Sequence, residues 1–107
     1  MSTYQQQLKI LADPKRFLIL QHLACCQRVV SCCEKISGEE HGCCVADLVQ
    51  ATELSQPTVS HHLKTLSDVG LVLREKRGTY ACYFANPRAI EALAAWLQRE
   101  LIPPDCI

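Results

Sequence analysis

The stretch SQPTVSHHLKTL, residues 55–66, decides the fold of this chain. Ser55 is a good helix N-cap and Pro57 suits a first helical turn, so the stretch predicts a helix that begins here. Its apolar residues recur with helical spacing and predict one buried face: Val59, Leu63 and Leu66. Gly70 is expected to end the helix.

The flanking sequence predicts the remaining elements. Two strand-like runs, LVLREK and TYACYFA, surround Arg77–Gly78 and predict a β-hairpin. Upstream, we expect a helix over residues 4–12, a second from Asp13–Pro14, and a third from about Cys44 to Ala51. A last helix should start at Asn86–Pro87. The order of four helices, a hairpin and a helix predicts a mainly α winged helix-turn-helix fold.

Size and composition favour one small domain. The chain has 107 residues, 49% of them hydrophobic, which suits a single domain over residues 1–107 with its own core. We expect the second helix to bury Phe17, Leu20, Leu23 and Ala24, and the last helix to carry an apolar side made of Ile90, Leu93, Ala94, Leu97 and Leu101. Because so small a domain buries a modest share of its surface, dimerisation would stabilise it.

No stretch approaches about 18 consecutive apolar residues, so we expect no membrane span. The N-terminal MSTYQQQLKI lacks a basic region followed by an apolar run, which argues against a signal peptide and for a cytoplasmic location. The chain contains no C-x-x-C pair and no βαβ pattern, so we do not expect an enzyme.

The helix over residues 55–66 has the features of a DNA-reading helix. Turning its apolar stripe inward leaves polar side chains outward: Gln56, Thr58, Ser60, His61, Lys64 and Thr65. Such groups can pair with base edges in the major groove, and the helix N-terminus attracts phosphate. The hairpin adds Arg74, Lys76 and Arg77, which gives this region a small basic excess although the whole chain is neutral. His62 lies nearer the buried side and is expected to pack.

Four stretches resemble the ArsR/SmtB family of metal-responsive repressors, in order and over nearly the whole chain: LADPKRFLIL, CVADL, LSQPTVSHHLKTLSDVGLV and REKRGTYACYFANP. The resemblance implies a dimeric repressor whose first and last helices pack across the two-fold axis, and whose hold on operator DNA weakens when an inducer binds. It also implies that Gln56, Ser60 and His61 contact bases, and that the wing around Arg77 approaches the minor groove or the backbone.

Six of the eight cysteines form three doublets: Cys25–Cys26, Cys32–Cys33 and Cys43–Cys44. In the cytoplasm structural disulfides are rare, so the doublets favour soft-ion binding or redox sensing. Thiolates select soft ions. We rank Cys43/Cys44 and Cys32/Cys33 first as ligands and Cys25/Cys26 next, with His41 as an optional fourth ligand. We expect Cys82 to be a packing residue and leave Cys106 open.

The doublets also mark where the chain departs from the family it resembles. A frequent sensor in that family is CVCDL at the start of the third helix, whereas this chain reads CVADL, with Ala46 in place of the second cysteine. Ahead of it lies a Cys-rich insertion at about residues 27–42. The last helix contains no histidine, so the family's other zinc site is unmatched.

The expected inducer is therefore As(III) or Sb(III), with Cd(II) or Pb(II) next and Zn(II) also considered. Three doublets giving one sulfur each would make a three-thiolate site. The alternative is a repressor of the same fold that senses oxidants or reactive sulfur species through thiol chemistry.

Overall fold

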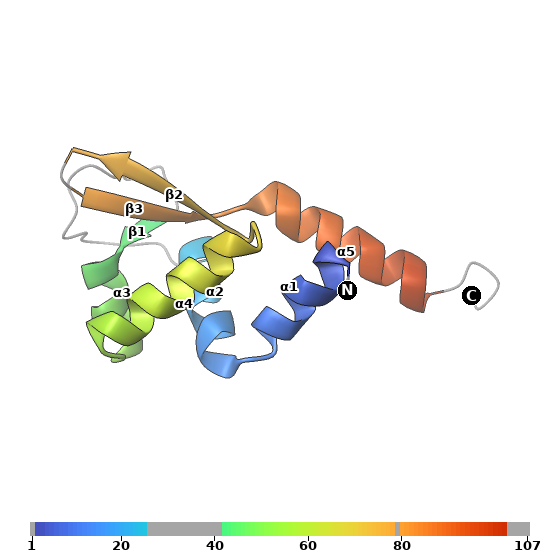
Figure 1. Ribbon diagram of the computed structural model, residues 1–107, viewed down its shortest axis with the longest axis horizontal. Helices are drawn as coiled ribbons and strands as arrows, with labels where there is room; N and C mark the ends of the chain where they lie inside the picture. Colours follow the sequence, from blue (N-terminus) through green and yellow to red (C-terminus); the bar gives the residue numbers. More distant parts are fainter. Residues whose placement is uncertain (1, 26–41, 79, 103–107) are drawn as a thin grey trace.

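The computed structural model describes residues 2–25, 42–78 and 80–102. Within them the elements follow the predicted order, with one short strand added (Figure 1). They are α1 (Thr3–Leu11), α2 (Pro14–Cys25), β1 (Gly42–Cys44), α3 (Val45–Thr52), α4 (Gln56–Asp68), β2 (Val72–Arg77), β3 (Tyr80–Ala85) and α5 (Pro87–Leu101). The predicted winged helix-turn-helix layout is confirmed. The insertion predicted at about 27–42 falls almost wholly outside the described residues and stays a prediction.

The three strands form one antiparallel sheet in the order β1-β3-β2. Strands β2 and β3 are the predicted hairpin, and β1 adds to the outer edge of β3 with Cys44 opposite Cys82. Sequence reasoning placed Cys44 at about the start of the third helix. The structure instead ends β1 at Cys44, which becomes the N-cap of α3, and its N–H donates to Asp47 Oδ2 at 3.2 Å.

The core gathers around α4. Its predicted stripe is confirmed, because Val59, Leu63 and Leu66 are all fully buried. Helix α2 contributes Ile19, Leu20 and Leu23, which are buried in the same cluster. The expectation for α2 was wrong at two positions, since Phe17 and Ala24 are exposed. A helix that is apolar around most of its circumference leaves the buried face ambiguous, and tertiary packing selects it.

Local hydrogen bonds fix where α4 and the wing meet. Ser55 Oγ accepts the N–H of Thr58 at 3.3 Å and so caps α4 as predicted. Gly70 follows with a φ of +80°, a conformation that favours glycine. Asn86 Nδ2 donates to the carbonyl of Gly70 at 2.9 Å, while Asn86 Oδ1 accepts the N–H of Ala89 and caps α5. One side chain therefore joins the end of α4 to the start of α5.

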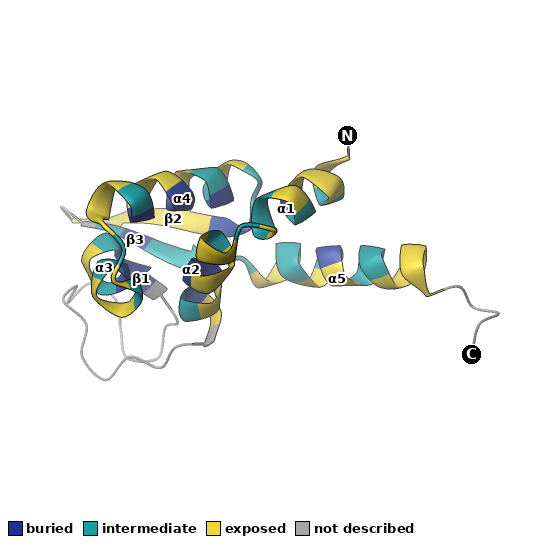
Figure 2. Ribbon diagram, turned by 90° about the horizontal axis from the view of Figure 1, so that it is seen from below, coloured by how far each residue is buried: buried dark blue, intermediate teal, exposed yellow. Residues whose placement is uncertain are grey.

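Helix α5 leaves the base of the sheet and runs away from it, with α1 alongside (Figures 1 and 2). The Tyr4 and Trp96 rings stack with centroids 5.2 Å apart and hold the two helices together. Leu93 is buried, as expected for the apolar side of α5, whereas Ala94 and Leu101 on that side are exposed. The far end of α5 thus presents apolar surface. None of the described helices is long and apolar enough to cross a membrane.

Candidate nucleic-acid interface and thiol sites

The predicted outer face of α4 is accessible. Gln56, Ser60, His61 and Lys64 are exposed, and the two threonines are half-buried. This division follows from the helix period, because the same turns bury Val59, Leu63 and Leu66 on the opposite side. The face therefore combines an amide, a hydroxyl, an imidazole and an ammonium group, all of which can hydrogen-bond to base edges or phosphates.

The hydroxyl groups of Thr58 and Thr65 form local hydrogen bonds at α4. Thr58 Oγ1 accepts from Ser55 Oγ at 2.8 Å, and Thr65 Oγ1 donates to the carbonyl of His61 at 3.1 Å. Lys64 Nζ lies 3.2 Å from Asp68 Oδ2 in an exposed ion pair. An exposed pair contributes little to stability, so Lys64 can exchange Asp68 for a phosphate at small cost. Gln56, Ser60 and His61 are thus the stronger candidates for base contacts.

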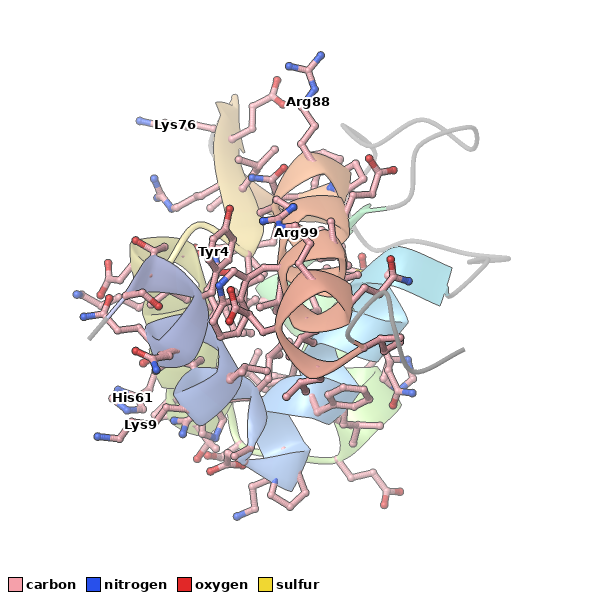
Figure 3. The ribbon with its side chains drawn as sticks, turned by 90° about the vertical axis from the view of Figure 1, so that its right-hand side faces the viewer. Tyr4, Lys9, His61, Lys76, Arg88 and Arg99 are labelled. Carbon is pink, nitrogen blue, oxygen red and sulfur yellow. The ribbon has the colours of Figure 1, made fainter. Side chains whose placement is uncertain are left out.

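The wing places further cations on the same side. Arg74 and Lys76 are exposed on β2, while the Arg77 side chain lies outside the described part of the structure. Figure 3 shows Lys76 of the wing and His61 of α4 directed toward the same side of the molecule. Lys9 of α1 points there too, and it is a candidate phosphate contact that sequence reasoning did not include. Lys9 lies far from residues 55–66 in the sequence, so no local pattern connected it with them.

His62 has the packing role that was predicted for it. It is only 8% exposed, and its Nδ1 has no hydrogen-bond partner among the described residues. Burial lowers the pKa of His62, while the nearby Asp13 carboxylate acts in the opposite direction and Arg16, His61 and Lys15 reinforce the lowering. The lowered pKa favours the neutral form of His62, and its burial keeps it away from the exposed face of α4.

This lowered pKa predicts acid-sensitive stability. The unfolded chain takes up a proton near the ordinary histidine pKa of 6.5, before the folded protein does, so stability falls as pH drops below that value and is unaffected above it. Thermal unfolding from pH 7.5 to 5.5 should show a falling Tm in the wild type and a smaller fall in His62→Gln. Ser60→Ala, an exposed position on the same helix, removes no titrating group and is the control, so it should keep the wild-type dependence. Equal slopes for all three proteins would contradict the prediction.

The two sulfurs of the Cys43–Cys44 doublet lie on opposite faces of β1. Cys43 is 5% exposed and belongs to the main core, whereas Cys44 is 6% exposed and packs with Cys82 and Phe84. This separation follows from the two-residue period of a strand. Cys82 is fully buried, in agreement with its expected packing role. A single ion at this strand would therefore reach one member of the doublet.

Most of the predicted ligands, and Cys106, whose role the sequence leaves open, fall outside the described part of the chain. Cys26, Cys32, Cys33, His41 and Cys106 lie outside the described residues, and so does the side chain of Cys25 at the end of α2. Within the described ranges, no three His, Cys, Asp or Glu side chains are grouped closely enough to hold a metal ion. Sequence reasoning also missed the position of Cys82 opposite Cys44, because the 37 residues between them carry no signal of strand register.

Comparisons with known proteins agree with this geometry. Residues 37–73 match the family model described as "Bacterial regulatory protein, arsR family". The arsenical resistance operon repressor of Bacillus subtilis is 36% identical over 90 residues, which cover 84% of this chain and 72% of that protein. The protein of the same description from Staphylococcus xylosus is 39% identical over 79 residues, covering 74% of this chain and 62% of that one.

Solved structures share the fold. An ArsR-like transcriptional regulator from Rhodococcus sp. RHA1 aligns with a TM-score of 0.69 at 22% identity, covering 92% of this chain and 78% of that one. The homodimeric winged helix-turn-helix domain of Mb0332 from Mycobacterium bovis aligns with a TM-score of 0.64 at 24% identity, covering 88% and 74%. The matched family is one of regulatory proteins, not enzymes. With the buried stripe of α4, its polar outer face and the paired wing, these matches show that the chain belongs to the arsR family of bacterial regulatory proteins.

Proposed function

We propose that the protein is a DNA-binding transcriptional repressor that leaves its operator when cysteine thiolates bind a thiophilic metalloid. The observation that carries the proposal is the α4 surface, where a fully buried apolar stripe forces polar side chains outward on the side that the wing also faces. Related proteins of the same family are described as arsenical resistance operon repressors, which supports both parts of the proposal.

The mode of DNA contact follows from the shape of α4. Its N-terminal half enters the major groove, where Gln56, Ser60 and His61 meet base edges. A second group binds phosphates or the adjacent minor groove and positions the helix: Thr58, Lys64, Thr65, Arg74, Lys76 and Arg77. The protein acts in the cytoplasm, where it can reach operator DNA.

Binding as a homodimer accounts for the apolar end of α5. Leu101 is 72% exposed and Ile102 is 56% exposed, although both side chains are large and apolar. Packing α1 and α5 against a second copy would remove this surface from water. A two-fold dimer would present two α4 helices to two half-sites about 34–36 Å apart, one turn of DNA.

The inducer is proposed from the chemistry of the donors. Thiolates favour As(III) or Sb(III), then Cd(II) or Pb(II). Zn(II) is a weaker candidate because it prefers four ligands. The proposed ligands come from the three doublets: Cys32, Cys33, Cys43, Cys44, Cys25 and Cys26. Because Cys43 and Cys44 face opposite sides of β1, one ion would take a single sulfur from that doublet.

Thiol oxidation is the second candidate signal. The observation in its favour is the pair Cys44 and Cys82, which lie opposite each other in the β1–β3 ladder. Oxidation or sulfur transfer at such thiols would also change the wing. Mass spectrometry of protein released from DNA separates the two signals, because a bound ion supports metalloid sensing and a disulfide or persulfide mass without an ion supports thiol oxidation.

A release titration tests the proposed function. Operator duplexes are first selected from a random-sequence library, and fluorescence anisotropy then follows the bound fraction as arsenite, antimonite, Cd(II), Pb(II) or Zn(II) is added. We expect release by arsenite or antimonite at the lowest concentrations, with recovery of binding on adding a chelating dithiol. Failure to select any DNA, or release by none of these ions, would contradict the proposal.

The wing should contribute affinity without sequence preference. Arg74→Ala and Lys76→Ala should each lower the slope of log affinity against log salt by about 0.9, because each removes one phosphate contact. Arg88→Ala serves as the control, since Arg88 is an exposed cation that Figure 3 shows directed elsewhere. A slope that stays at the wild-type value in both wing variants would exclude phosphate contacts by Arg74 and Lys76.

A further inference from the structure

We propose that Cys44 and Cys82 together form a two-thiol binding site for a trivalent arsenical, which joins the start of α3 to the wing strand β3. The inference rests on the proposed function and adds Cys82, a residue that sequence reasoning treated as packing, to the inducer site. It also selects Cys44 rather than Cys43 as the ligand supplied by β1.

The strand register carries the geometry. Cys44 and Cys82 are directly opposed in an antiparallel pair, so their side chains leave the same face of the sheet. Opposed residues of this kind have Cβ atoms about 4.5–5.5 Å apart. The two residues share a buried cluster with Phe84, apart from the main core. Two cysteines 38 positions apart in the sequence are thus held opposite each other in the sheet.

The other half of the doublet is held away. Cys43 is opposed to Tyr83, and both belong to the main core cluster on the other face of the sheet. Rotating Cys43 toward Cys82 would require β1 to turn over, which would remove Cys43 from that core. Cys43 and Cys44 are thus two neighbouring buried cysteines, and only Cys44 lies on the same face as Cys82. Cys43 can therefore be used as the control for Cys44.

The usual spacing of an opposed strand pair leaves room for an interposed atom. Its Cβ separation of about 4.5–5.5 Å lies at or above the upper end of the range of about 3.5–4.5 Å for a disulfide. A direct bond would therefore draw the two strands together, whereas an arsenic atom can lie between the sulfurs. Zinc needs four ligands, and the described residues offer no group of three or more at any point. Trivalent arsenic can bind two thiolates and keep a hydroxyl or aryl group as its third substituent.

The binding step balances without oxidation. Arsenous acid exchanges two of its hydroxyl groups for two sulfurs, and each hydroxyl leaves as water with one thiol proton. Two As–S bonds replace two As–O bonds, arsenic stays trivalent, and both sulfurs stay reduced. A chelating dithiol reverses the exchange by supplying competing thiols.

The location links the ligand to both DNA-binding elements. Cys44 is the N-cap of α3, and α3 packs against α4. Cys82 lies in β3, which pairs with β2 along the whole hairpin. Both sulfurs are almost completely buried, so an inserted atom must displace neighbouring groups. Displacement there changes the spacing between α4 and the wing, and hence their fit to one DNA duplex.

Phenylarsine oxide tests the pair directly, because its arsenic exchanges one oxygen for two thiols and releases one water. Two variants each retain two cysteines, Cys44 with Cys82 or Cys43 with Cys82, and the other six are replaced by serine or alanine. Native mass spectrometry and thiol titration should show one adduct with loss of both thiols, at least about tenfold tighter for Cys44 with Cys82. Circular dichroism verifies folding. Equal binding by the two folded variants would overturn the inference.

A single substitution in the otherwise intact chain covers the case in which the multiple variants do not fold. Cys82→Ala should raise the arsenite concentration for half-release from operator DNA at least about tenfold. Losing a residue that only supports a ligand already lowers metal affinity about 10–100-fold, and losing the ligand itself should lower it at least as much. Val72→Ala, also a buried sheet position, should release as the wild type does. If arsenite releases the wild type and Cys82→Ala from operator DNA at the same concentration, the two-thiol site is overturned and the proposed function stands. If arsenite does not release the wild type, the proposed function itself is overturned.

Discussion

Replacing Gln56 and His61 together with alanine is expected to weaken operator binding at least about 30-fold while the protein stays folded. A good side chain to base contact is worth about 1–3 kcal/mol, so losing two should cost at least about 2 kcal/mol. Both side chains are exposed on α4, and neither contributes to the core. Fluorescence anisotropy with the selected operator measures the loss, and binding to an unrelated duplex should change much less.

Helix α2 offers a control with the same two residue types. Gln21 is exposed and His22 is half-buried on α2, a helix that lies behind α4 in Figure 1. Gln21→Ala/His22→Ala removes the same two chemical groups from a different surface and should leave operator affinity within about twofold of the wild type. Similar losses in both double variants would mean that the effect is not specific to α4.

Leu63→Ala is expected to cost about 2–5 kcal/mol of unfolding free energy, the largest stability effect we predict. Leu63 is fully buried and lies in the cluster that joins α4 to α2 and α3. Truncating it removes apolar contacts and leaves a cavity between helices that hold one another in place. Because small domains are stable by only about 5–15 kcal/mol, a large fraction of the protein's stability would be lost.

Urea unfolding followed by circular dichroism measures this cost. Ser60→Ala on the exposed side of the same helix is the matched control and should change stability by less than about 0.5 kcal/mol. The two variants should also separate by function, since Ser60→Ala affects DNA binding and Leu63→Ala affects folding first. A cost below about 1 kcal/mol for Leu63→Ala would show that α4 is not anchored as the structure indicates.

The sequence predicted the DNA-binding half of the fold well because its signals are local. Ser55, Pro57 and the stripe of α4 determine where that helix begins and which side is buried, and the structure agrees at each position. The hairpin and the start of α5 at Asn86 were predicted for the same reason. In each case the residues that form the element also carry its capping or turn chemistry.

Helix α2 and strand β1 show where local signals end. Apolar residues surround α2, so its sequence fits several buried faces, and contact with α4 selects Ile19 over Phe17. Strand β1 has only three residues, too few for an alternating pattern, and it exists because β3 has an edge to pair with. The Cys44–Cys82 pair depends on that register and therefore could not be found from cysteine spacing.

Asn86 has a mechanical consequence for signalling. Its side chain holds the carbonyl of Gly70 at the end of α4, its own N–H donates to the carbonyl of Leu71, and its Oδ1 caps α5. Helix α4, the base of the wing and α5 therefore meet at one short hydrogen-bonded junction. A ligand at Cys82 that tilted β3 would also rotate α5, because the two elements are joined at Asn86. In a dimer that packs through α5, this rotation would change the distance between the two copies of α4.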